Sequence, residues 1–301
     1  MKNFLLYAST VLIWGSTWLA ITFQLDTVAP MVSVAYRFTL AAIILLIYCK
    51  IKGLNLNYKS KDHIYFALLG FFLFSMNYWS VYISEIYITS GLVAVLFSSI
   101  VFFNTFNGYF ILKSPITLNM IIGAIIGFAG IALTFEHEIQ SFEFSDHSVF
   151  GLILGLIAAF SASLGNITAE FISRRGLPVM QTNAFGMAYG AIVMLGISLI
   201  TGQAFVIPQT FSYISSLLYL SVFGSIVAFG LYLTLLGRIG SAKSAYVAML
   251  IPVVALVFST VFEDFHWSLS TYIGVGLILA GNYILMQSKT KISLKSSVLK
   301  N

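Results

Sequence analysis

The stretch from residue 176 to residue 237 contains no charged side chain, and long apolar segments fill most of the rest of the 301-residue chain. A helix that rises about 1.5 Å per residue needs about 20 apolar residues to cross the hydrocarbon core of a bilayer. Cutting the chain at charges, prolines and glycine-containing turns leaves ten such segments, at 4–22, 31–49, 64–84, 90–112, 117–135, 149–173, 180–201, 212–237, 242–262 and 271–288. The sequence therefore predicts an all-α integral membrane protein with ten transmembrane helices.

The composition excludes a soluble globule. Only 8% of the residues are charged and 59% are hydrophobic, whereas soluble domains carry about 25% charged residues. Cys49 is the only cysteine, so neither an intrachain disulfide nor a cysteine metal site is expected. All four histidines fall in predicted loops or at helix ends without the spacing of a metal motif, so no metal or other cofactor is expected.

The basic residues occupy alternate loops. Fourteen of the fifteen lie before the first segment, after the tenth, or in the loops at 50–61, 113, 174–175 and 238–243. The intervening loops carry acidic residues and no Lys or Arg. Because cytoplasmic loops are enriched in Lys and Arg, this pattern predicts that both termini, including the basic tail 289–301, are cytoplasmic and that the loop 136–147 is external. The net charge of +5 thus reflects orientation in a lipid bilayer, and no nucleic-acid partner is expected.

The second half of the chain echoes the first. Three pairs of residues share an offset of 151 positions, namely Gly123 with Gly274, Ala129 with Ala280, and Gly130 with Gly281. Two five-helix repeats are therefore predicted, at 1–135 and 148–288, on either side of the external loop. Because five is odd, the second repeat enters the membrane from the opposite side, which makes the repeats inverted. Inverted repeats recur in secondary transporters, with the substrate site near the midplane between them.

Four stretches carry a resemblance to a known family: Trp14-Gly15-Ser16-Thr17, Pro30 with Arg37, the run 252–263, and GVGLILAG at 274–281. The chain resembles the drug/metabolite transporter superfamily, in its ten-helix EamA-type branch. The resemblance implies export of amino acids or related metabolites across the cytoplasmic (inner) membrane of a bacterium, without enzymatic activity. The chain departs from the family pattern at 100–102, which lacks the usual proline, at 113–114, which lacks the usual acidic residue, and at 162–163, which replaces a common Trp-Ala pair.

Polar and aromatic residues at mid-membrane depth form the predicted substrate-binding set. Trp14 and Trp18 are four residues apart and share a helix face, around a Gly-Ser-Thr stretch that lets a neighbouring helix approach. Asn77 would be costly against lipid, so it is expected to face inward. The candidate substrate-binding residues are Trp14, Thr17, Trp18, Arg37, Asn77, Tyr78, Ser99, Asn166, Tyr232 and Tyr246.

Arg37 is the one basic residue that lies inside a predicted span. It either anchors an anionic group of the substrate or has a structural role, through an ion pair with Glu85 at the outer end of the third span or through hydrogen bonds to helix-end carbonyls. Glu170 precedes Arg174 by four residues, a spacing that favours an interfacial ion pair over a proton relay. The paired glycines at 123/127, 151/155 and 186/190 favour static helix packing over sliding surfaces.

Three classes of function fit a ten-helix membrane protein. The one we favour is a secondary transporter that moves a small polar metabolite by alternating access; a channel-like facilitator and a membrane-embedded enzyme are the alternatives. A channel calls for a continuous polar stripe or charged ring, and an enzyme calls for an intramembrane catalytic constellation. No P-loop is present, so uphill transport would need proton or exchange coupling. The sequence leaves the oligomeric state open.

Overall fold

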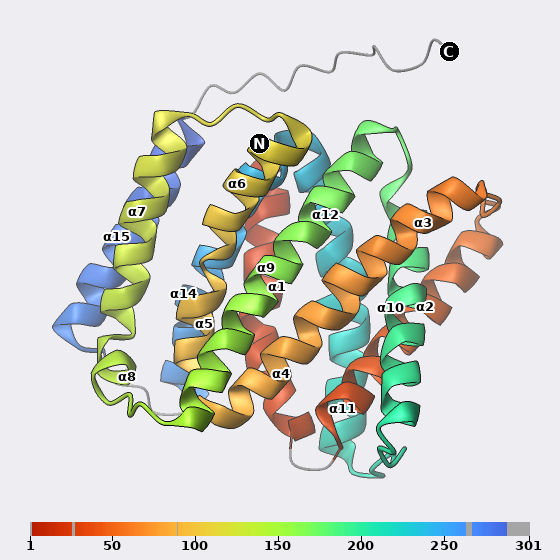
Figure 1. Ribbon diagram of the computed structural model, residues 1–301, viewed down its shortest axis with the longest axis horizontal. Coiled ribbons are helices and arrows are strands. Elements are labelled where there is room, and N and C mark those ends of the chain that lie inside the picture. Colours follow the sequence, from red (N-terminus) through yellow and green to blue (C-terminus); the bar gives the residue numbers. More distant parts are fainter. Residues whose placement is uncertain (1, 26–27, 89, 263–266, 288–301) are drawn as a thin grey trace.

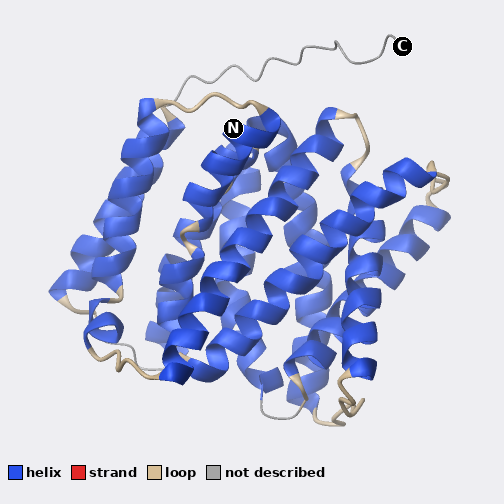
Figure 2. Cartoon of the chain, viewed as in Figure 1, coloured by secondary structure: helices blue, strands red, loops and turns tan. Residues whose placement is uncertain are grey.

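The computed structural model of the protein describes residues 2–25, 28–88, 90–262 and 267–287, and all regular structure in these ranges is helical (Figure 2). The helices of the first half are α1 (Lys2–Leu25), α2 (Pro30–Ile51), α3 (Ser60–Leu69), η1 (Gly70–Met76), α4 (Asn77–Tyr87), α5 (Ser90–Phe97), α6 (Ile100–Leu112), α7 (Leu118–Thr134) and α8 (Glu136–Gln140). Those of the second half are α9 (Asp146–Arg174), α10 (Val179–Ile200), α11 (Phe211–Tyr219), η2 (Leu220–Val227), α12 (Ala228–Ile239), α13 (Ser241–Ser244), α14 (Val247–Phe262) and α15 (Leu269–Met286).

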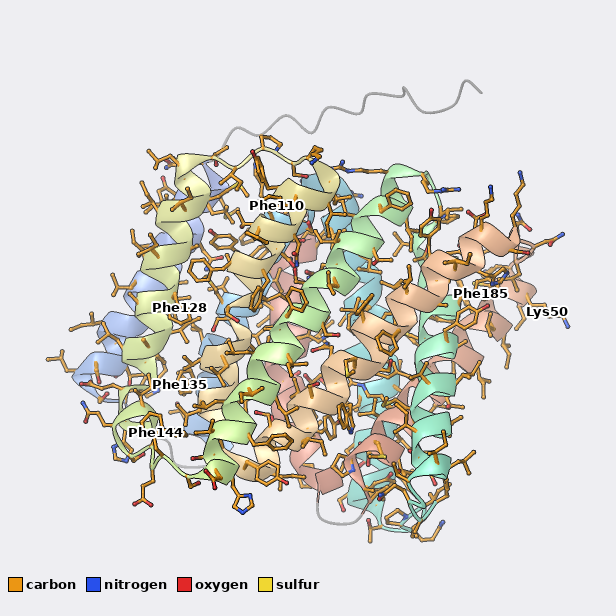
Figure 3. The ribbon with its side chains drawn as sticks, viewed as in Figure 1. Lys50, Phe110, Phe128, Phe135, Phe144 and Phe185 are labelled. Atoms are coloured by element: carbon orange, nitrogen blue, oxygen red, sulfur yellow. The ribbon has the colours of Figure 1, made fainter. Side chains whose placement is uncertain are left out.

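Eight helical segments of the described residues are long and apolar enough to cross a membrane, and four of them run through two or three consecutive elements: Ser60–Tyr87, Val95–Leu112, Phe211–Ile239 and Ser241–Phe258. α7, with 17 residues, is a shorter apolar helix, and α1 has 24 residues. The prediction of an all-helical membrane protein is therefore confirmed. Large exposed apolar side chains such as Phe110 cover the outside of the bundle (Figure 3). That outside suits lipid and not water, as the low charge content requires.

Local sequence signals determine where the helices begin and end. Pro30 opens α2, where its missing N–H costs nothing. The side chain of Thr117 caps α7, and Ser145 caps α9 in a reciprocal capping box with Ser148. In the charge-free stretch, α10 ends at Ile200 and α11 begins at Phe211, as the turn residues between them predict.

Two predicted spans are not single helices. The segment 90–112 is divided into α5 and α6, and the hydroxyls of Ser98 and Ser99 donate to the carbonyls of Val95 and Leu96 at 2.7 and 2.6 Å. The segment 242–262 is divided into α13 and α14. Serine hydroxyls that bond to a nearby carbonyl offer the backbone an alternative to the helical ladder, which explains the break between α5 and α6.

Two π-helical stretches interrupt otherwise regular spans. η1 joins α3 to α4, and η2 joins α11 to α12. Ser75 donates to the carbonyl of Gly70 at 3.1 Å, and Ser225 donates to the carbonyl of Leu220 at 2.9 Å, each reaching five residues back. These two serines lie 150 positions apart in the chain. π-helical turns are rare and often mark functional sites.

α7 and α15 lie side by side at one end of the bundle (Figure 1), with their backbones in close contact. A Cβ added to Gly123 would lie 2.7 Å from the carbonyl oxygen of Gly281, and one added to Gly130 would lie 2.6 Å from that of Gly274. The lower-numbered glycine of one helix thus faces the higher-numbered glycine of the other, so the two helices run antiparallel. Only glycine lets the two backbones come this close. In lipid, where no hydrophobic effect drives helices together, such close van der Waals packing is what holds α7 against α15.

Candidate functional site

A cavity with a volume of about 120 Å³ lies in the middle of the bundle. We call it the central cavity. By the same measure a cavity needs about 10–15 Å³ to hold one water, so the central cavity accommodates several waters or a small solute. It is lined by residues of both halves of the chain: Trp14, Thr17, Ile21, Arg37, Leu73, Asn77, Tyr78, Val81, Val93, Phe97, Ile100, Ala162, Asn166, Phe229, Tyr232, Ala248, Ile251 and Pro252.

Seven of the ten predicted site residues line the central cavity: Trp14, Thr17, Arg37, Asn77, Tyr78, Asn166 and Tyr232. Ser99 does not; its hydroxyl donates to the Leu96 carbonyl within its own chain segment. Tyr246 does not either, because its hydroxyl donates to the carbonyl of Met120 on α7. Trp18 lies on α1, but its side chain is outside the described part of the structure.

The Gly-Ser-Thr stretch of α1 makes the contacts that bring neighbouring helices close. A Cβ at Gly15 would collide with Val254 of α14, so the glycine admits that helix. The hydroxyl of Ser16 hydrogen-bonds with that of Tyr219 on α11, and the hydroxyl of Thr17 donates to the Trp14 carbonyl at 2.7 Å. The stretch is therefore a packing surface, and its Thr17 also lines the central cavity.

Trp14 is held in place by the second half of the chain. Its indole Nε1–H donates to the carbonyl of Gly224 in η2 at 3.1 Å. Its ring lies against Phe229 and Tyr232 of α12, with centroid separations of 4.9 and 5.0 Å. These contacts make one continuous aromatic wall from α1 to α12, in the range where aromatic pairs attract.

Arg37 is 1% exposed and reaches the central cavity from α2. Its Nε donates to the hydroxyl of Ser225 at 2.9 Å. Its Cζ lies 4.9 Å from the centroid of the Tyr78 ring, a cation–π distance. A Cβ at Gly224 would lie 3.1 Å from Arg37 Nη2, so the glycine of η2 makes room for the guanidinium.

The ion pair between Arg37 and Glu85, one of the alternatives that the sequence left open, is not formed. Among the described residues the ion pairs are Glu170 with Arg174 and Asp62 with Arg175. Arg37 Nη1 and Glu85 Oε1 are instead both buried without a hydrogen-bond partner. Arg37 therefore brings a positive charge to the cavity wall without an ion-pair partner among the described residues, and its Nε bonds to the neutral hydroxyl of Ser225.

The two π-helical stretches adjoin or support several of the residues that line the central cavity. η1 contributes Leu73 and leads directly into Asn77 and Tyr78, while η2 contributes Gly224 and Ser225 to the support of Trp14 and Arg37. Each stretch shifts the helical register, which changes the face on which the following residues lie. Sequence reasoning did not foresee this; the recurrence of a serine at 75 and 225 is the one signal that could have suggested it.

A second polar cluster lies near the α6–α7 and α9–α10 connections. Glu170 pairs with Arg174 at 2.6 Å, as its spacing predicts, and also accepts the backbone N–H of Ser241 at 2.6 Å. Arg174 donates to the carbonyl of Leu112 and to the hydroxyl of Ser114, at 3.1 and 3.0 Å. We call these five residues the Glu170 cluster. It joins α9 to the turn before α13 and to the end of α6, and so links the two halves.

The paired glycines pack against neighbouring helices. Gly186 and Gly190 of α10 meet the α3–η1 rod, where a Cβ at Gly70 would lie 2.5 Å from the Gly186 carbonyl oxygen. Gly151 and Gly155 of α9 meet side chains of α4 and α5. Within the described part of the chain, no group of three or more His, Cys, Asp or Glu residues is placed to hold a metal ion.

Comparisons with known proteins agree with this architecture. A model of the EamA-like transporter family matches the chain twice, at residues 1–136 and 149–287. An uncharacterized transporter of Archaeoglobus fulgidus is 24% identical over 96% of this chain and 100% of its own length. The uncharacterized inner membrane transporter YedA of Escherichia coli is 28% identical over 89% of this chain and 85% of its own length.

Two further proteins are informative. A probable amino-acid metabolite efflux pump of Escherichia coli is 25% identical over 94% of both chains. A protein of known crystal structure has the same fold, with a TM-score of 0.78 over 94% of this chain and 95% of its own, at 15% identity. The resemblance seen in the sequence is confirmed: the chain is a multi-pass membrane transporter, not an enzyme, and belongs to the EamA-like transporter family.

Proposed function

We propose that the protein is a secondary transporter that exports an amino acid or a related small polar metabolite by alternating access. The observation that carries this proposal is the central cavity, which both halves of the chain line and which combines aromatic walls with a few buried polar groups. Ligand sites have this mixture of apolar lining and precisely placed polar groups. The efflux pump of Escherichia coli supports the substrate class and the direction by similarity alone.

The proposed architecture is ten transmembrane helices in two inverted five-helix repeats, at 1–135 and 148–288. Adding α1 and α7 to the eight membrane-capable helices brings the count to ten. The double match of the family model supports the duplication. The exchange of glycine partners between α7 and α15 supports the inversion, because a twofold axis in the membrane plane would produce it.

The proposed orientation has both termini on the cytoplasmic side of a bacterial inner membrane. The connections α2–α3, α6–α7, α9–α10 and α12–α13 would then be cytoplasmic, as would the tail 289–301, which is outside the described residues. The loop 136–147, with α8 in it, would be external. The basic residues of the former loops support this arrangement.

Flux through the purified protein in proteoliposomes tests the proposal. A carrier gives flux of labelled amino acid that saturates with concentration and is accelerated by unlabelled amino acid on the opposite side. Flux that rises linearly and shows no such acceleration would favour a channel-like facilitator and defeat alternating access. Imposing a proton gradient or loading the lumen with substrate then distinguishes proton coupling from exchange.

A further inference from the structure

Three residues that line the central cavity each carry a buried polar atom without a hydrogen-bond partner in the described part of the protein: Arg37 Nη1, Asn77 Oδ1 and Asn166 Oδ1. The three residues are only 1%, 6% and 1% exposed. A buried polar group without a partner costs free energy, about 1–3 kcal/mol for a neutral group and more for a charged one. Three such atoms at one cavity therefore indicate a missing ligand that carries the complementary groups.

The complement of Arg37 is an anion. A guanidinium carries five N–H donors and accepts nothing, and Ser225 takes only the one on Nε. The Nε bond and the Tyr78 ring beside Cζ together hold the guanidinium plane, while Nη1 is buried without a hydrogen-bond partner. A planar carboxylate matches this fork in two parallel hydrogen bonds.

The complement of the two asparagines is a donor. The amide nitrogen of Asn77 donates to the carbonyl of Leu73 at 3.3 Å, so the opposite oxygen, Oδ1, is the atom left to accept. Asn77 also directly precedes Tyr78, whose ring lies beside Arg37, so cation and acceptor are close together on the cavity wall. Asn166 brings the second free amide oxygen from α9.

Most of the rest of the cavity wall is apolar. Ile21, Val81 and Val93 lie on the part of the wall formed by α1, α4 and α5, and Phe97, Ile100 and Ile251 add further apolar side chains. A solute that fits must therefore combine its polar groups in one compact head and carry an apolar body. With a volume of about 120 Å³, the cavity also requires that body to be small.

Resting on the proposed transport function, we infer that the central cavity binds a small zwitterion with an apolar side chain. Arg37 holds its carboxylate, and the amide oxygens of Asn77 and Asn166 accept from its ammonium group. The two charges of an α-amino acid are one carbon apart, which suits the neighbouring placement of Arg37 and Asn77. A solute without either charge leaves one side of the site unpaired, and such sites reject analogues strongly.

The test uses the purified full-length protein in detergent, with glycine, alanine, valine, leucine, isoleucine and methionine as probes. Each is compared with its C-terminal amide, which has no carboxylate, and its N-acetyl derivative, which has no ammonium. The thermal midpoint is measured against probe concentration to obtain apparent affinity. At least one free amino acid should raise the midpoint, and both of its derivatives should bind at least about 10-fold more weakly.

Substitutions test which residue binds the carboxylate of the ligand and which binds its ammonium group. Arg37→Lys keeps the charge but loses the fork, so the apparent affinity for the free amino acid should fall at least about 10-fold. Asn77→Leu should weaken the free amino acid while changing the N-acetyl derivative little. Asn183→Leu is the matched control, because Asn183 is also 1% exposed with an unpartnered Oδ1 but does not line the cavity.

Three results would overturn the inference. One is the absence of any midpoint shift with the six free amino acids. The second is equal binding of a free amino acid and its amide or N-acetyl derivative. The third is unchanged affinity in the double variant Arg37→Gln with Glu85→Gln. Saturable, trans-accelerated flux of an uncharged solute would leave the transport function standing while the zwitterion site fell, so the two proposals fail separately.

Discussion

Gly224 is the position where the smallest change should disturb the central cavity most. In Gly224→Ala the new Cβ would lie 2.9 Å from Thr17 Cγ2 and 3.1 Å from Arg37 Nη2, whereas carbon atoms prefer about 3.5–4.0 Å. Neither neighbour yields freely, because the hydroxyl of Thr17 bonds to the Trp14 carbonyl and Arg37 Nε bonds to Ser225. The methyl group must therefore push the guanidinium by a few tenths of an ångström or more.

The magnitude follows from two opposing effects. Overpacking costs about 1–3 kcal/mol, and replacing glycine by alanine in a helix returns up to about 1 kcal/mol. The free energy of unfolding should thus fall by no more than about 3 kcal/mol, which is less than the about 5–15 kcal/mol that typically stabilises a folded protein. The effect on substrate binding should be larger, about 10-fold in apparent affinity, since a site loses its fit when groups move by about 0.5 Å.

Gly230→Ala supplies the control for this experiment. Gly230 lies in α12, six residues further along the same span, and nothing lies within 4 Å of a Cβ added there. Thermal unfolding in detergent and flux in proteoliposomes are measured for both variants. If Gly224→Ala melted and transported like Gly230→Ala, the claim that Gly224 makes room for Arg37 would be wrong.

Three further outcomes are expected. In a Cys49→Ser background, a cysteine at Gln140 should react with a membrane-impermeant thiol reagent in intact cells; reaction only after the cells are opened would refute the orientation and the inversion. Trp14→Ala should reduce flux while membrane abundance stays near normal, because the ring borders a cavity; full flux with lost abundance would show that Trp14 only packs. Glu170→Gln should lower the unfolding free energy by about 1–3 kcal/mol, since Arg174 and the Ser241 N–H lose a charged acceptor; an unchanged thermal midpoint would show that the Glu170 cluster does not stabilise the link between the halves.

The sequence was sufficient to predict which segments are apolar helices and how far along each helix a residue lies, because both follow from the positions of charges and apolar runs. The ion pair of Glu170 with Arg174 could be predicted for a similar reason, since side chains four residues apart lie on the same face of a helix. It was harder to predict which residues face the cavity. Ser99 and Tyr246 lie at depths comparable with the cavity residues, yet one hydroxyl bonds within its own segment and the other bonds to Met120 of a neighbouring helix.

The π-helical stretches explain part of this difference. A regular helix repeats its faces every 3.6 residues, whereas a π turn advances that register by an extra residue. Asn77 follows η1 and Ser225 lies within η2, so their directions depend on turns that hydropathy does not reveal. The hydrogen-bond partner of Arg37 could not be predicted from the sequence either. Glu85 is the nearest charge by depth, but the neutral hydroxyl of Ser225 is what the structure places beside Arg37 Nε.

The close contact of α7 with α15 has a consequence for how the chain is made. The glycine face of α7 has its partner in a helix that follows far later, since Gly281 comes 158 residues after Gly123, which it faces. At a synthesis rate of about 5–20 residues per second, α15 emerges roughly 8–30 s after α7. During that interval the bare backbone groove of α7 faces lipid or the insertion machinery. Ribosome pausing, early termination or slow insertion of the last span would therefore leave a nearly complete chain that quality-control proteases can recognise by this one unpaired helix.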